Sequence, residues 1–88
     1  MPPGIVGFEA LGRHGALGVV VDVEELGEQA PALVVRGGVS EALVYHVPWA
    51  RVRAVSLRER QVVLDLDLAD FDPFLRDDGI VELRPARR

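Results

Sequence analysis

The chain has 88 residues, a formal net charge of −4 at pH 7 and a hydrophobic fraction of 49%. This length suits one domain, and the composition is that of a globular protein rather than a disordered tail. The absence of cysteine excludes disulfides, thiolate zinc sites and cysteine nucleophiles. The net negative charge disfavours general binding of nucleic acid. Because neither a signal sequence nor a membrane-length apolar run is visible, we expect a cytoplasmic protein without a membrane span.

Short apolar runs separated by glycine, proline or charge predict a chain of β-strands, and no long stretch keeps the apolar spacing of a helix. In chain order, we expect strands over residues 5–11, 16–26, 32–36, 41–47, 52–57 and 61–68, and a short last strand over 80–83. The breaks between them are predicted at 12–15, 27–31, 37–40, 48 and 58–60.

The third and fourth strands are expected to form a hairpin around a pair of glycines. A four-residue loop, Gly37 to Ser40, would place Val34 opposite Leu43 on one face and Leu33 opposite Val44 on the other. Both faces of the pair would then be apolar. A second cover is therefore predicted for one face, either the C-terminal extension or another copy of the chain.

The segment 61–68 has the clearest strand pattern of the chain. Its aliphatic side chains alternate with Asp65 and Asp67, so we expect the aspartates to be exposed and one face to be buried, formed by Val62, Leu64, Leu66 and Leu68. After this strand the pattern changes, and Asp72-Pro73 predicts an N-cap and first turn of a short helix within 69–78.

These elements predict an all-β fold. We expect a small antiparallel β-barrel of five to six strands with one short helical turn near the C-terminus. The expected organisation is a single domain over residues 1–88, with a core at about 5–68 and a C-terminal extension at 69–88.

Three segments of the chain resemble the PRC-barrel family, named for the photosynthetic reaction centre H subunit. The same barrel forms the C-terminal domain of a bacterial ribosome maturation factor. The similar segments are GALGVVVDV at 15–23, ALVVRGG at 32–38 and VPWARV at 47–52. The resemblance implies a small bacterial β-barrel that serves protein contacts and assembly, with no shared catalytic residues.

No constellation of catalytic, cofactor-binding or metal-binding residues is apparent. His14 and His46 are two separated histidines, whereas a transition metal requires three or four converging ligands. The carboxylates at 65, 67, 70 and 72 lack the glycine and terminal glutamate of a calcium loop. No serine lies in a nucleophile-elbow motif, and no glycine-rich phosphate loop is present. We therefore expect neither an enzyme nor a cofactor.

The expected function is a non-enzymatic protein-interaction or assembly module, acting as a homo-oligomer such as a homodimer. The alternative is an RNA- or ribosome-associated accessory protein, which would bind through the arginines at 51, 53, 58 and 60. Trp49, which follows a proline at a strand end, is either core packing or a contact anchor. The candidate partner contacts are Val34, Val44, Trp49, Arg51 and Arg53.

Overall fold

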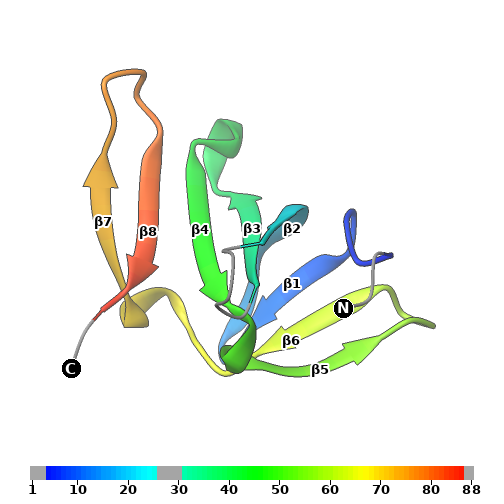
Figure 1. Cartoon of the computed structure of the whole chain (residues 1–88). Coiled ribbons are helices and arrows are strands. Elements are labelled where there is room, and N and C mark those ends of the chain that lie inside the picture. The colour runs from blue at the N-terminus through cyan, green and yellow to red at the C-terminus, as the bar shows by residue number, and fades with distance from the viewer. Residues whose placement is uncertain (1–3, 26–30, 87–88) are drawn as a thin grey trace.

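The computed structural model describes residues 4–25 and 31–86. Eight strands form one sheet, which confirms the all-β class, and the helical residues of this described part all lie in short 3-10 turns (Figure 1). The strands are β1 (Glu9–Gly12), β2 (Gly15–Glu24), β3 (Ala32–Gly37), β4 (Leu43–Pro48), β5 (Val52–Ser56), β6 (Gln61–Leu64), β7 (Phe71–Leu75) and β8 (Val81–Pro85). The 3-10 turns are η1 (Val39–Glu41), η2 (Trp49–Arg51) and η3 (Leu68–Asp70). The predicted break at 27–31 lies, apart from Pro31, outside the described residues.

The sheet is open, with strand order β5-β6-β1-β2-β3-β4-β8-β7. Its pairs are antiparallel except for β1 with β6 and β4 with β8, which are parallel. The predicted closed antiparallel barrel of five or six strands is therefore not confirmed. The physical reason is that β8 occupies the free edge of β4, the edge with which β5 would have to pair to close a barrel.

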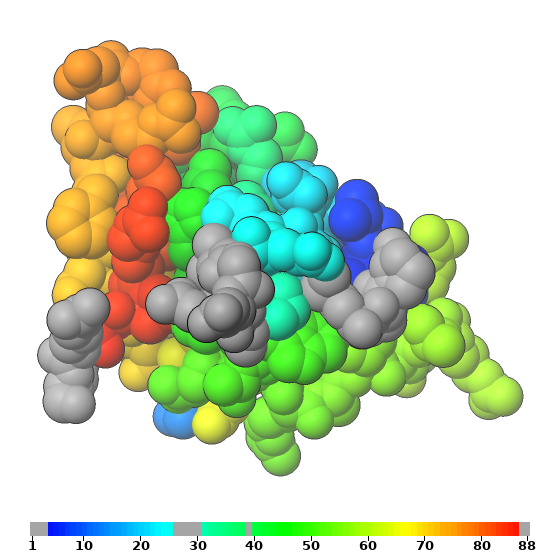
Figure 2. Space-filling model, viewed as in Figure 1, coloured from blue at the N-terminus to red at the C-terminus, as the bar shows by residue number. Residues whose placement is uncertain are grey.

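The C-terminal extension adds to the sheet instead of folding over it. The β7–β8 hairpin forms one side of the molecule, opposite the projecting β5–β6 turn (Figure 2). The predicted helix beginning at Asp72-Pro73 is wrong, because both residues lie in β7. Pro73 is tolerated there because β7 is an edge strand, where a missing N–H interrupts no ladder on the open side.

The helical turn near the C-terminus begins five residues earlier than predicted, at Asp67 instead of Asp72. The Asp67 Oδ1 accepts a hydrogen bond from the Ala69 N–H at 3.0 Å, and the Asp70 Oδ2 accepts one from the Asp67 N–H at 3.0 Å. This reciprocal capping box fixes η3 and turns the chain from β6 toward β7.

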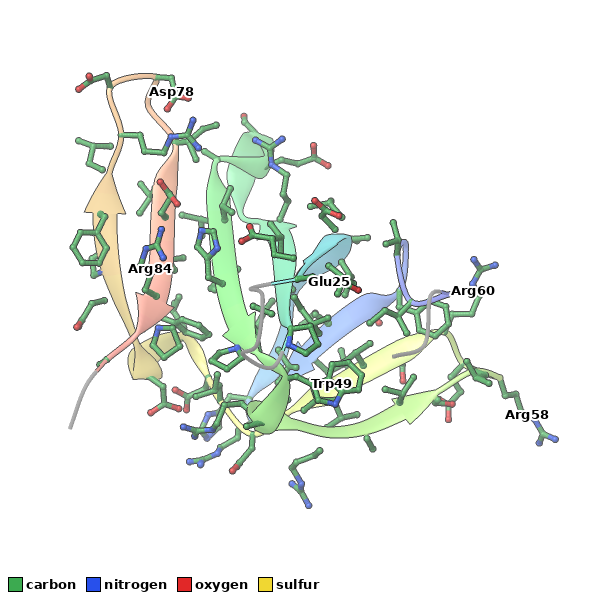
Figure 3. All side chains as sticks on the ribbon, in the orientation of Figure 1. Glu25, Trp49, Arg58, Arg60, Asp78 and Arg84 are labelled. Atoms are coloured by element: carbon green, nitrogen blue, oxygen red, sulfur yellow. The ribbon has the colours of Figure 1, made fainter. Side chains whose placement is uncertain are left out.

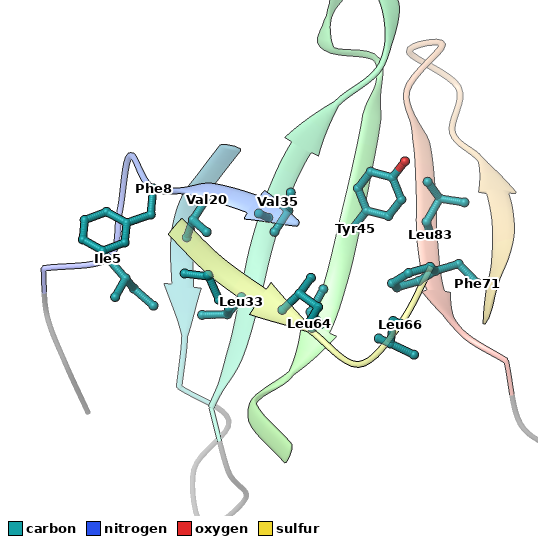
Figure 4. Packing of buried hydrophobic residues seen from close by; sticks show 13 residues of the cluster. Ile5, Phe8, Val20, Leu33, Val35, Tyr45, Leu64, Leu66, Phe71 and Leu83 are labelled. Carbon is teal, nitrogen blue, oxygen red and sulfur yellow. The ribbon is translucent and has the colours of Figure 1, made fainter. Parts of the chain in front are cut away.

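Aliphatic and aromatic side chains from the inner face of the sheet converge in one core (Figure 4). The predicted burial of Val62, Leu64 and Leu66 is confirmed. Leu68 was predicted to join them but is 57% exposed, because β6 ends at Leu64 and Leu68 lies on the capped turn. Asp65 and Asp67 were predicted to be exposed and are half-buried.

The pairing of β3 with β4 differs from the predicted register. Arg36 lies opposite Val44 and Val34 lies opposite His46, so the predicted four-residue loop is wrong. The loop instead spans residues 38–42 and contains η1, in which Ser40 and Glu41 both adopt positive φ. The observed register separates the two faces by chemistry: the inner one carries Leu33, Val35, Tyr45 and Val47, and the outer one carries Val34, Arg36, Val44 and His46.

Two leucines of the 61–68 segment test this description of the core. Replacing Leu64, which is 1% exposed, by alanine should cost about 2–5 kcal/mol of unfolding free energy, because it leaves a cavity. Leu68→Ala is the matched control and should cost roughly 0.5 kcal/mol or less, as expected for a surface position. Urea denaturation of both variants measures the difference. Similar losses would contradict the end of β6 at Leu64.

Candidate interaction face

The site residues predicted at 34 and 44 lie together on the side of the sheet opposite the core. We call this surface, formed by β2, β3, β4 and the β7–β8 hairpin, the outer face. A groove of about 500 Å³ crosses it and is lined by Val21, Asp22, Glu24, Val34, Arg36, Val44, Arg76 and Ile80. By strand register, His46 lies beside Val34, and Glu82 lies beside Val44.

The apolar part of the outer face is formed by branched aliphatic side chains. Val21 is 41% exposed, Val34 is half-buried and Val44 is 8% exposed. Ile80, which precedes β8, adds a fourth aliphatic side chain to the groove. These side chains come from three strands and a loop, so the apolar surface exists only in the folded chain.

Charged groups of both signs surround these aliphatic side chains. The carboxylates are Asp22, Glu24 and Glu82, and the guanidinium groups are Arg36, Arg76 and Arg84. The Arg36 Nε is buried and has no hydrogen-bond partner among the described residues. A buried polar group without a partner is costly, but this Nε is covered within the chain, so a carboxylate of another molecule cannot reach it directly.

His46 joins two carboxylates across the outer face. Its Nε2 lies 2.8 Å from the Glu82 Oε1, and its Nδ1 lies 3.8 Å from the Glu24 Oε1. Glu82 also faces the Arg84 Nη2 at 3.3 Å and the Arg76 Nε at 3.8 Å. The hydrogen bond from His46 and these positive charges lower the pKa of Glu82 below its ordinary value, while partial desolvation opposes that shift.

The other three predicted contacts lie elsewhere. Trp49, in η2, is half-buried and packs against the core, and its role as a contact anchor stays a prediction. The Arg51 Nη2 donates a hydrogen bond to the Asp65 carbonyl oxygen at 2.8 Å, and Arg53 is exposed at a bulge of β5. The structure therefore brings Val34 and Val44 together and leaves the other candidates on a different part of the molecule.

The other arginines of the predicted cluster differ in their surroundings. Arg60 lies over the Phe8 ring, with its Cζ atom 5.7 Å from the ring centroid. Arg58 and Arg60 project at the opposite side of the molecule from Asp78 and Arg84 in the β7–β8 hairpin (Figure 3). Two of the four arginines, Arg51 and Arg60, are thus engaged within the chain.

A second polar pair, His14 and Asp67, borders a cavity that sequence reasoning missed. The His14 Nδ1 lies 2.8 Å from the Asp67 Oδ2, beside a cavity of about 170 Å³ whose wall includes Tyr45. Burial raises the pKa of the Tyr45 hydroxyl. Because the two residues are separated by 53 positions, no local spacing signals their contact. Neither serine of the chain lines this cavity.

Three observations bear on what these surfaces can hold. Within residues 4–25 and 31–86, no group of three or more histidine or acidic side chains is placed to hold a metal ion. In the same ranges, no helix is long and apolar enough to cross a membrane. A scan against protein-family models finds no match, and a search of curated proteins finds no relative.

The contact between His46 and Glu82 gives a testable pH behaviour. In His46→Leu, we expect the pKa of Glu82 to rise toward its ordinary value, because leucine cannot donate the hydrogen bond that is the main cause of its lowering. Arg84→Gln, which removes a smaller cause, should raise it less. A pH titration of the Glu82 side-chain carboxyl by NMR measures both shifts.

The sign of the linked stability follows from the direction of the shift. Because the folded-state pKa of Glu82 lies below its unfolded value, the contact stabilises the fold at pH values above the unfolded pKa. This stabilisation is lost as the pH falls through the lowered folded-state pKa. A larger rise of the Glu82 pKa in Arg84→Gln than in His46→Leu would contradict the central role of His46.

Proposed function

We propose that this chain is a non-enzymatic interaction and assembly module that associates with a second copy of itself through the outer face. The observation that carries this proposal is the groove of branched aliphatic side chains ringed by charges of both signs. A contiguous surface of this kind on a small domain is typical of an interaction site.

The chemistry of the outer face suits a second copy better than a partner of one charge. It carries both arginines and carboxylates, interspersed around the aliphatic centre. A two-fold interface uses the same patch on both subunits, so a patch with both charges can satisfy itself. A partner that presented only one charge would leave some of these groups facing like charge.

The two edge strands of the sheet are poorly suited to pairing with another strand, which favours contact through a face. The edge strand β7 carries Pro73, which donates no backbone hydrogen bond, and the edge strand β5 is interrupted by a bulge at Arg53. Proline and bulges are devices by which proteins prevent edge-to-edge pairing. Association through added strands is therefore disfavoured at both ends of this sheet.

The resemblance to PRC-barrel proteins supports the same class of function. The similar segments form β2, β3 and the corner from β4 through η2. Two of these strands, β2 and β3, contribute directly to the outer face. We propose that the chain shares with that family a role in assembly, with this face as the contact surface.

The alternative function, RNA binding through the arginine cluster, has less support from the geometry. Its favourable observation is that Arg53 and Arg58 are exposed and have no ion pair within the described part of the chain. Fluorescence anisotropy with single-stranded RNA tests it. Binding that weakens steeply with salt and is lost in an Arg53→Glu, Arg58→Glu variant would favour the alternative over self-association.

Arginine substitutions on the outer face test the proposed association. Val21→Arg and Val34→Arg should weaken the dimer at least roughly tenfold, because each introduces an unpaired charge into the contact. Leu57→Arg, in the exposed β5–β6 turn, is the matched control and should leave the dimer intact. Sedimentation velocity measures the association, and thermal melts confirm that the variants fold.

Val21 makes this test robust, because its side chain is already 41% exposed and an arginine there fits a folded monomer. A wild-type chain that stays strictly monomeric at high micromolar concentration would refute the proposal. Loss of the dimer in Leu57→Arg alone would place the contact surface at the β5–β6 turn instead.

A further inference from the structure

We propose that association through the outer face is controlled by pH, with a proton taken up at His46 as the two copies meet. This inference rests on the proposed function, since it describes the regulation of the same surface. It would make the dimer tighter in mildly acidic solution and weaker in mildly basic solution.

A neutral His46 imidazole has too few N–H donors for the two carboxylates that face it. The two imidazole nitrogens of His46 face the carboxylates of Glu82 and Glu24, at 2.8 Å and 3.8 Å. A neutral imidazole has one N–H and one lone pair, so it can donate to only one of them. A protonated imidazole carries two N–H groups and can donate to both.

The two carboxylates differ in how many positively charged partners they have. Glu82 faces the Arg76 and Arg84 guanidinium groups in addition to His46. For Glu24, His46 is the sole ion-pair partner within the described residues. When His46 is neutral and donates to Glu82, its lone pair is directed toward the Glu24 carboxylate, which then lacks a donor and depends on water.

Covering the face removes that water. An unpaired carboxylate becomes costly when a partner surface displaces its solvent, whereas a hydrogen-bonded ion pair is tolerated. His46 itself is 17% exposed, so a second copy would complete a burial that the fold has already begun. Dimerisation therefore favours the protonated imidazole over the neutral one.

The other charged groups around His46 also favour the protonated imidazole. They come from β2, β3 and the β7–β8 hairpin and comprise Asp22, Glu24, Arg36, Arg76, Asp78, Glu82 and Arg84, with Asp78 paired to Arg76 at 2.9 Å. Their formal charges sum to −1, so they add to the preference that the close carboxylates set. Histidine changes charge between pH 5 and 8, whereas these carboxylates and guanidinium groups keep theirs across most of that window.

The test is the dissociation constant of the dimer as a function of pH, measured by sedimentation equilibrium between pH 6 and 8. For the full wild-type chain, we expect the dissociation constant to rise roughly hundredfold from pH 6 to pH 8 if about half a proton is taken up per subunit, which is about one per dimer. His46→Gln, which keeps a neutral N–H donor but cannot be charged, should give a nearly constant value. His14→Gln replaces the only other histidine, which lies at the His14–Asp67 cavity, and should keep the wild-type dependence.

The outcomes separate this inference from the function on which it rests. A dimer whose dissociation constant is constant with pH, or which tightens toward pH 8, would overturn the control by His46 and leave the assembly module standing. A chain that is monomeric at every pH would refute both proposals. A pH dependence that disappears in His14→Gln and persists in His46→Gln would assign the proton to the other side of the molecule.

Discussion

The register in which β3 and β4 pair is the constraint on which the rest of this structure depends. Each strand alternates between two faces, so one choice of register decides which four side chains enter the core and which four form the outer face. With Val35 opposite Tyr45 and Val34 opposite His46, Val35 and Tyr45 face the core, and the polar side chains Arg36 and His46 lie on the outer face. A shift of β4 by one residue would bring His46 into the core, and a shift of β3 by one residue would bring Arg36 there.

That register also creates the chemistry of the outer face. His46 comes within reach of Glu82 because β8 pairs with β4, and within reach of Glu24 because β2 pairs with β3. The three side chains come from strands far apart in the sequence, and no two of them are neighbours along the chain. The aliphatic groove and the charged ring are thus products of sheet topology, and they would disappear together if the topology changed.

Much of the local structure could be predicted from the sequence. Period-two alternation correctly predicts most of the strands, and the buried face of the 61–68 segment was identified because Leu64 and Leu66 alternate with Asp65 and Asp67. The predictions failed where two local signals compete. Asp67 and Asp72 are both plausible caps, and their choice depends on Asp70, which completes the capping box at Asp67. Similarly, two glycines predict a hairpin without revealing that the loop continues through a 3-10 turn.

The order of strands could not be predicted, because it depends on contacts between distant segments. Placing β8 beside β4 opens the predicted barrel and brings Glu82 to His46, and no local pattern encodes that choice. The contact between His14 and Asp67 was missed for the same reason. Val34 and Val44 were identified as contacts from a wrong register, and the observed register also places them together on one face.

The most direct test of the outer face as an interface is an isotope-filtered NOE experiment on an equimolar mixture of labelled and unlabelled chains. It detects contacts between copies only. If two copies meet through this face, intermolecular NOEs will connect the methyl groups of Val21, Val34, Val44 and Ile80. Intermolecular NOEs confined to Leu57 or to residues of the edge strands β5 and β7 would contradict the account.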